Sequence, residues 1–146
     1  TDIQAAMGLV ELERYEENLA RRKAIFSSYN QAFSAENWAI TPRYIDEEKE
    51  SSYHLYLLRI NGISEAQRDS IIQKIFEKEV SVNVHFQPLP LLTAYKNLGY
   101  DINDFPIAYH KYQTEVSLPV YYNLDAAQVQ QVVTAVINSV EKILKH

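Results

Sequence analysis

Residues 80–87 read V-S-V-N-V-H-F-Q, a strict alternation of apolar and polar side chains. Period-two alternation of this kind predicts a β-strand that buries one face against a core. The predicted core face comprises Val80, Val82, Val84 and Phe86. The opposite face ends in His85 and Gln87, directly before a turn through Pro88 and Pro90. An imidazole and a carboxamide beside a rigid loop suit the binding of a polar ligand, so His85 and Gln87 are the predicted binding residues.

The chain before this strand predicts one long helix and two extended segments. Residues 2–34 carry apolar side chains at helical spacing, and Asp2 is the predicted cap of this helix. Residues 38–42 predict a short strand. Residues 51–60 are apolar on both faces and predict a central strand, on which His54 is expected to be a hydrogen-bonded core histidine.

Two capping boxes predict the starts of two further helices. They pair Ser64 with Gln67 and Asp125 with Gln128. The first helix should bury Ile71, Ile72, Ile75 and Phe76, and the second Val129, Val132, Val133, Val136, Val140 and Ile143. Between them lie two predicted short helices and one extended segment, at residues 91–97, 107–114 and 116–118.

This order of elements predicts an α+β fold, with a small antiparallel-type sheet of three to four strands and helices on one side. A helix of about 32 residues would be about 48 Å long, longer than a small domain. We therefore expect residues 1–34 to connect to a missing N-terminal domain, and residues 35–146 to form a C-terminal small domain. The only methionine, Met7, lies inside the helical pattern and is a poor initiator. The chain is expected to be the C-terminal part of a longer protein.

The composition narrows the classes of function. The chain has 146 residues, of which 47% are hydrophobic and 23% charged, as in an ordinary globular domain. Only three glycines occur, and neither common glycine-rich phosphate loop is present. The absence of cysteine excludes disulfides and thiolate sites and fits a cytoplasmic location. Four scattered histidines predict no metal site. A net charge of -5 and the lack of a long apolar run predict neither a nucleic-acid nor a membrane partner.

Six segments of the chain, in this order, resemble one enzyme family. They are TDIQAAMGLVEL at 1–12, SSYHLY at 51–56, VNVHFQPLP at 82–90, YKNLGY at 95–100, DFPIA at 104–108 and EVSLPVY at 115–121. Together they resemble the C-terminal portion of the DegT/DnrJ/StrS-type sugar-nucleotide aminotransferases. The resemblance covers nearly the whole chain and implies the small domain of the aspartate-aminotransferase fold.

The resemblance also implies a cofactor, substrates and an assembly. Enzymes of this family use pyridoxal 5'-phosphate to move an amino group, usually from glutamate, to a keto group on a nucleotide-linked sugar. The lysine that carries the cofactor and the carboxylate that holds its pyridine nitrogen lie in the larger N-terminal part of such enzymes. We therefore expect no catalytic and no cofactor-binding residue in this chain, a homodimer in the intact enzyme, and a fragment that is inactive alone.

One motif departs from the family pattern. Family members commonly carry V-H-Y-x-P-L-H, whereas residues 84–90 read V-H-F-Q-P-L-P. The first histidine of the pattern matches His85, which the resemblance implies to be an active-site residue. Phe86 replaces the tyrosine, and Pro90 stands where the second histidine would be. The second histidine's contacts with a substrate therefore cannot be transferred to this chain.

Two other functions fit the same sequence. The chain could be a stand-alone binding or regulatory module that kept the fold and lost the chemistry. It could also belong to a sugar dehydratase of the same family, in which the cofactor lysine is replaced. The residue that separates transaminase from dehydratase is not in this sequence, and neither the sugar, the nucleotide nor the position of amination can be derived from it.

Overall fold

A three-stranded antiparallel sheet forms the centre of the molecule, seen in a computed structural model that describes residues 1–145. Its strands are β1 (Ala39–Ile40), β2 (Tyr56–Ile60) and β3 (Glu115–Leu118), in the order β1-β2-β3. The predicted central position of the second strand is confirmed, although that strand begins at Tyr56 and not at residue 51. His54 lies before it and is exposed, so its prediction as a core histidine is wrong.

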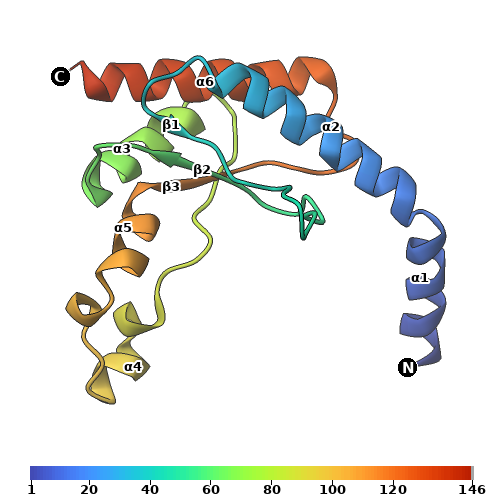
Figure 1. Cartoon of the computed structure of the whole chain (residues 1–146), viewed down its shortest axis with the longest axis horizontal. Coiled ribbons are helices and arrows are strands. Elements are labelled where there is room, and N and C mark those ends of the chain that lie inside the picture. Colours follow the sequence, from blue (N-terminus) through green and yellow to red (C-terminus); the bar gives the residue numbers. More distant parts are fainter. Residues whose placement is uncertain (146) are drawn as a thin grey trace.

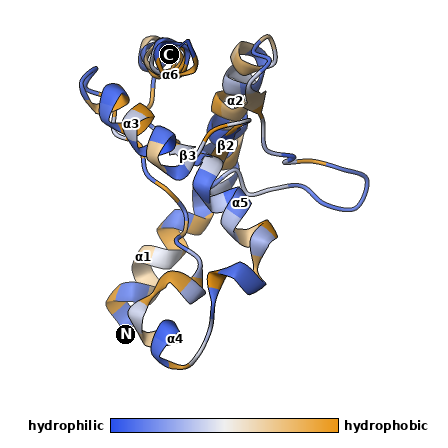
Figure 2. Ribbon diagram, turned by 90° about the vertical axis from the view of Figure 1, so that its left-hand side faces the viewer, coloured by the Kyte–Doolittle hydropathy of each residue, from blue (hydrophilic) through white to orange (hydrophobic). Residues whose placement is uncertain are grey.

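Three helices cover one face of the sheet and enclose the core. They are α2 (Tyr15–Phe33), α3 (Glu65–Phe76) and α6 (Ala126–Leu144). Figures 1 and 2 show these helices at one end of the molecule, with the strands beneath them. The core joins their apolar residues to Tyr56, Leu58 and Ile60 of β2 and to Val116 and Leu118 of β3. The predicted α+β fold with helices on one side is thereby confirmed.

The predicted caps and core residues of α3 and α6 agree with the structure except at three positions. Both capping boxes are formed, by Ser64 with Gln67 and by Asp125 with Gln128. Phe76, predicted to be buried, is 48% exposed, because it lies at the last turn of α3 and faces outward. Ile72 of α3 and Ile143, near the end of α6, are only partly buried.

The predicted long N-terminal helix is two helices. α1 (Asp2–Glu13) ends at Arg14, whose ψ of 1° breaks the helical backbone before α2 begins. The N-cap of α1 is Thr1, which forms a capping box with Gln4, so the prediction of Asp2 as the cap is wrong by one residue. No residue of α1 is buried, and Figure 1 shows this helix standing away from the sheet.

The segment between α3 and β3 extends away from the three covering helices (Figure 1). It contains the short helices η1 (Leu89–Leu91), α4 (Thr93–Asn97), η2 (Ile102–Asp104) and α5 (Pro106–Thr114). Both predicted short helices are therefore present. α5 leads directly into β3, which places it beside the uncovered face of the sheet.

Candidate functional site

The face of the sheet opposite the helices carries polar side chains at its centre. Alternation along β2 and β3 sends Arg59, Glu115 and Ser117 to this face, while Leu58 and Val116 face the core. The register pairs Arg59 with Glu115 across the two strands. Glu115 and Ser117 are nevertheless only 5% and 4% exposed, so another segment must cover them.

That covering segment is the one predicted to be the alternating strand. It contributes only an isolated bridge, in which the Asn83 and Ser117 backbones exchange hydrogen bonds of 3.2 and 2.7 Å. Val82 faces the core as predicted, but Phe86 is 73% exposed, so its assignment to the core face is wrong. The antiparallel register of the bridge brings His85 opposite Glu115, and the alternation of burial ends at Val84, which was predicted to face the core and is half-buried like His85.

His85 is fixed by three contacts on this face. Its backbone N–H donates to Glu115 Oε2 at 3.0 Å, and its Nδ1 lies 2.7 Å from Ser117 Oγ. Its ring meets the Phe86 ring edge to face, with 4.7 Å between the centroids. Ser117 Oγ in turn donates a short hydrogen bond to Glu115 Oε1. The result is a continuous chain of hydrogen bonds from a buried carboxylate to a half-buried imidazole.

Burial raises the pKa of Glu115, because a carboxylate is poorly solvated between β3 and the covering segment. Hydrogen bonds from Ser117 and from the His85 backbone oppose this rise in pKa, as do the charges of His85 and Arg68. The carboxylate is therefore held by donors on both oxygens, which is the usual requirement for a buried charged group.

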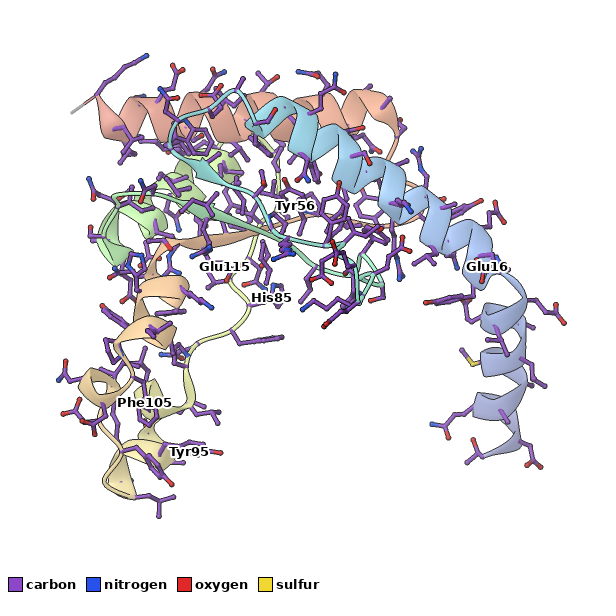
Figure 3. The ribbon with its side chains drawn as sticks, viewed as in Figure 1. Glu16, Tyr56, His85, Tyr95, Phe105 and Glu115 are labelled. Carbon is purple, nitrogen blue, oxygen red and sulfur yellow. The ribbon has the colours of Figure 1, made fainter. Side chains whose placement is uncertain are left out.

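A cleft of about 530 Å³ opens beside this hydrogen-bond chain. Its walls include His85 and Glu115 together with Arg43, Arg59 and Lys111. Figure 3 shows His85 and Glu115 close together on the side of β3 that faces away from α6. Three cationic side chains around a cleft that is also lined by Leu57, Phe86 and Pro88 favour an anionic ligand, and the imidazole supplies a directional hydrogen bond.

Buried Arg68 attaches α5 to the rest of the domain near this cleft. Its Nη1 donates to the Tyr112 carbonyl at 2.9 Å, and its guanidinium lies 4.8 Å from the centre of the Tyr112 ring. Tyr109 and Tyr112 both donate to Glu65 of α3. This cluster holds Lys111 and Tyr112, which line the cleft, at a fixed distance from α3.

Of the two predicted binding residues, the structure places His85 in the cleft and Gln87 outside its lining. Gln87 is exposed, while its neighbours Phe86 and Pro88 line the cleft. The sequence interpretation missed Glu115 and Ser117. Their signal was present in the strand E-V-S-L, where two polar residues alternate with two apolar ones directly before a proline.

The family model of the DegT/DnrJ/EryC1/StrS aminotransferases matches residues 1–137. This chain belongs to that family. The chain is similar to Spr1654 of Streptococcus pneumoniae, a protein named as a sugar aminotransferase, on which it superimposes with a TM-score of 0.96 at 41% sequence identity. That match covers 99% of this chain and 36% of the Spr1654 chain. The small-domain fold implied by the resemblance is thereby confirmed for this family member.

Two curated relatives of this DegT/DnrJ/EryC1/StrS family member have more specific names. The spore coat polysaccharide biosynthesis protein SpsC of Bacillus subtilis is 31% identical over 92% of this chain and 35% of its own length. The UDP-4-amino-4,6-dideoxy-N-acetyl-beta-L-altrosamine transaminase of Campylobacter jejuni is 26% identical over 99% of this chain and 38% of its own length. The chain thus spans little more than a third of the relatives it matches.

The described part of the chain contains neither a metal site nor a membrane-spanning helix. Residues 1–145 contain no group of three histidine, aspartate or glutamate side chains arranged to hold a metal ion. No helix within these residues is both long and apolar enough to cross a membrane.

Proposed function

We propose that this chain is the C-terminal part of a pyridoxal-phosphate-dependent aminotransferase that acts on a nucleotide-linked keto-sugar, with an amino acid, glutamate, as donor. The observation that carries the proposal is the cleft at His85, in a chain that belongs to an aminotransferase family. The cofactor is supported by Spr1654, which has been solved in its PLP form and resembles this chain at 40% identity.

The cofactor's attachment site is proposed to lie outside this chain. Each of the eight lysines is at least partly exposed, and none is buried in a site that would desolvate its amine. Lys111 alone among them lines the cleft at His85, and it is exposed. When bound in the parent enzyme, pyridoxal phosphate supplies the electron sink that amino-group transfer needs.

This chain's own contribution is to bind and orient the sugar nucleotide. Arg43, Arg59 and Lys111 provide positive charge for the diphosphate. His85 provides a hydrogen bond to a polar group of the sugar, and the exposed Phe86 ring provides an apolar surface beside it. Gln87 would join the site only if a neighbouring part of the enzyme closes over it.

The exposed apolar side chains of α1 support a connection to further protein. Ile3, Met7, Leu9, Val10 and Leu12 are each more than half exposed. We propose that residues 1–34 join the larger cofactor domain, that residues 35–146 act as the small domain, and that the parent enzyme is a cytoplasmic homodimer. Exposed apolar patches of this kind mark surfaces that pack on other protein.

Product analysis of the parent enzyme tests the proposed reaction. The enzyme is mixed with glutamate and a panel of nucleotide-linked keto-sugars, and release of 2-oxoglutarate is measured together with the aminated sugar. Equal amounts of both products are expected with one member of the panel. Loss of water from the sugar without consumption of glutamate would contradict the transaminase and favour a dehydratase.

A further inference from the structure

The direction of each hydrogen bond around His85 can be assigned from the donors available. Glu115 Oε2 accepts from the His85 backbone N–H, so the carboxylate's other oxygen remains for Ser117. Ser117 has one hydroxyl proton, and it donates that proton to Glu115 Oε1. The contact of 2.7 Å between Ser117 Oγ and His85 Nδ1 then requires the proton of the imidazole to lie on Nδ1.

We propose that Glu115 and Ser117 are positioning residues that hold His85 in its Nδ1–H tautomer, so that Nε2 faces the cleft as a hydrogen-bond acceptor. A histidine side chain free in water prefers the opposite tautomer, with its proton on Nε2. The hydrogen bond that one ring nitrogen makes decides which nitrogen carries the proton. The chain of hydrogen bonds from Glu115 through Ser117, here called the relay, therefore reverses the tautomer preference that histidine has in water.

The available space agrees with this assignment. Nδ1 and Nε2 lie on opposite sides of the ring, so a ring held at Ser117 by Nδ1 turns Nε2 away from β3. His85 lines the cleft, and within residues 1–145 its Nε2 makes no hydrogen bond with another side chain or with the backbone. Phe86 meets the ring edge to face at 4.7 Å and restricts its rotation.

The tautomer determines which ligand group His85 can recognise. An unprotonated Nε2 accepts a hydrogen bond from a hydroxyl or an N–H group and gives none to a phosphate oxygen. His85 should therefore select a hydroxyl of the sugar, while the diphosphate lies toward Arg43, Arg59 and Lys111. This consequence rests on the proposed function, whereas the tautomer itself does not.

Nitrogen NMR of the ¹⁵N-histidine-labelled chain tests the tautomer directly. At about pH 8.5, well above the ordinary titration of imidazole, His85 should show a protonated Nδ1 and an unprotonated Nε2. Exposed His54 serves as the internal reference and should show the opposite pattern. A proton on Nε2 of His85, with or without one on Nδ1, would overturn the proposal.

Two substitutions test the relay. In Ser117→Ala the acceptor for Nδ1 is lost, so the proton of His85 should move to Nε2. In Glu115→Gln the amide oxygen accepts the hydrogen bond from the His85 backbone N–H, so the amide NH₂ must donate a hydrogen bond to Ser117 Oγ. The Ser117 hydroxyl then donates to His85 Nδ1, and the proton of the imidazole should again move to Nε2. Ser139→Ala removes another buried hydroxyl, bonded to the Ala135 carbonyl on α6, and should leave His85 unchanged. If both site variants keep native amide spectra and His85 keeps its proton on Nδ1, Glu115 and Ser117 do not set the tautomer and the proposal is wrong.

Kinetics of the parent enzyme separate this inference from the proposed function. Ser117→Ala should lower kcat/KM for the sugar substrate about tenfold, and the loss should vanish with a substrate that lacks the hydroxyl recognised by His85. A normal tautomer result without any transaminase activity would contradict only the proposed function. An equal loss with both substrates would contradict the role of Nε2 as an acceptor for that hydroxyl.

Discussion

His85 and Glu115 lie opposite each other on neighbouring segments, with the His85 backbone N–H 3.0 Å from the Glu115 carboxylate. They are separated by 30 positions in the sequence and are joined by the register of a single bridge between Asn83 and Ser117. The pair defines one wall of the cleft. On this face opposite the helices, His85 is half-buried and Glu115 is only 5% exposed, so the imidazole is the more accessible group of the pair.

The ionisation of Glu115 should make the folding stability depend on pH. Because burial raises its folded pKa, the folded state binds a proton at pH values where the unfolded state has released it. The free energy of unfolding should therefore fall as the pH rises from about 4.3, the ordinary pKa of glutamate, through the raised folded pKa. The groups facing Glu115 are Arg59, Arg68 and His85.

Glu115→Gln should remove this component of the pH dependence. Urea unfolding of the chain and of the variant at a series of pH values between about 4 and 7 measures the difference in their stabilities. The stability of the chain relative to the variant should decrease as the pH rises. A relative stability that increases over this range would show that the folded pKa of Glu115 is lowered instead.

The hydroxyl of Tyr56 should stabilise the core. It is fully buried and donates to Asn30 Oδ1 at 2.6 Å. Tyr56→Phe leaves the ring contacts with Phe26 in place but removes this bond, so we expect a loss of about 1 kcal/mol in the free energy of unfolding. Tyr100→Phe changes an exposed tyrosine and is the matched control, for which thermal melts should show no change.

The apolar face of α1 should make the isolated chain associate or should leave this helix frayed. Ile3, Met7 and Val10 are exposed, and no residue of α1 is buried, so the helix lacks the packing that usually stabilises an amphipathic helix. Sedimentation gives the oligomeric state, and hydrogen exchange gives the protection of residues 3–10. A monomer in which these residues are strongly protected would contradict both outcomes.

The 146-residue chain should not form a stable internal aldimine with pyridoxal phosphate. No lysine within residues 1–145 is buried in a site that would desolvate its amine and favour it over the others. Visible spectra recorded after addition of the cofactor measure this. A stable stoichiometric adduct that is lost on substitution of one particular lysine would place an attachment site in this chain.

The sequence predicted the covered side of the sheet better than its open side. Capping boxes, with the spacing of isoleucines in α3 and of valines in α6, identified these two helices, because local hydrogen bonds and burial depend on residues three or four positions apart. Alternation identified the correct faces of Val82 and His85. It failed at Phe86, since the segment forms one bridge and then leaves the sheet.

The partners of His85 required knowledge of strand register. Ser117 and Glu115 lie about 30 residues away from His85, and only the antiparallel pairing brings them together. The break at Arg14 has helical residues on both sides of it, and its one sign in the sequence is the shift of the apolar stripe between Val10 and Leu12.

The most direct test of the account is the kinetics of His85→Ala in the parent enzyme. His85 is half-buried and fills no core volume, so the variant should fold and should keep the absorbance of the bound cofactor. Loss of a hydrogen bond from a polar group in the site costs about 1–3 kcal/mol, so kcat/KM for the nucleotide-linked sugar should fall roughly tenfold to a hundredfold. Reaction with the amino donor should be unchanged.

Val82→Ala is the companion variant, because Val82 is 7% exposed and belongs to the core. It should lower the free energy of unfolding by about 1–2 kcal/mol and keep the activity per folded molecule. The decisive measurement is kcat/KM for the sugar substrate in His85→Ala beside thermal melts of both variants. The account predicts a loss of kcat/KM without a lower Tm for His85→Ala. A His85→Ala enzyme that melts early, or that retains full kcat/KM for the sugar, would contradict it.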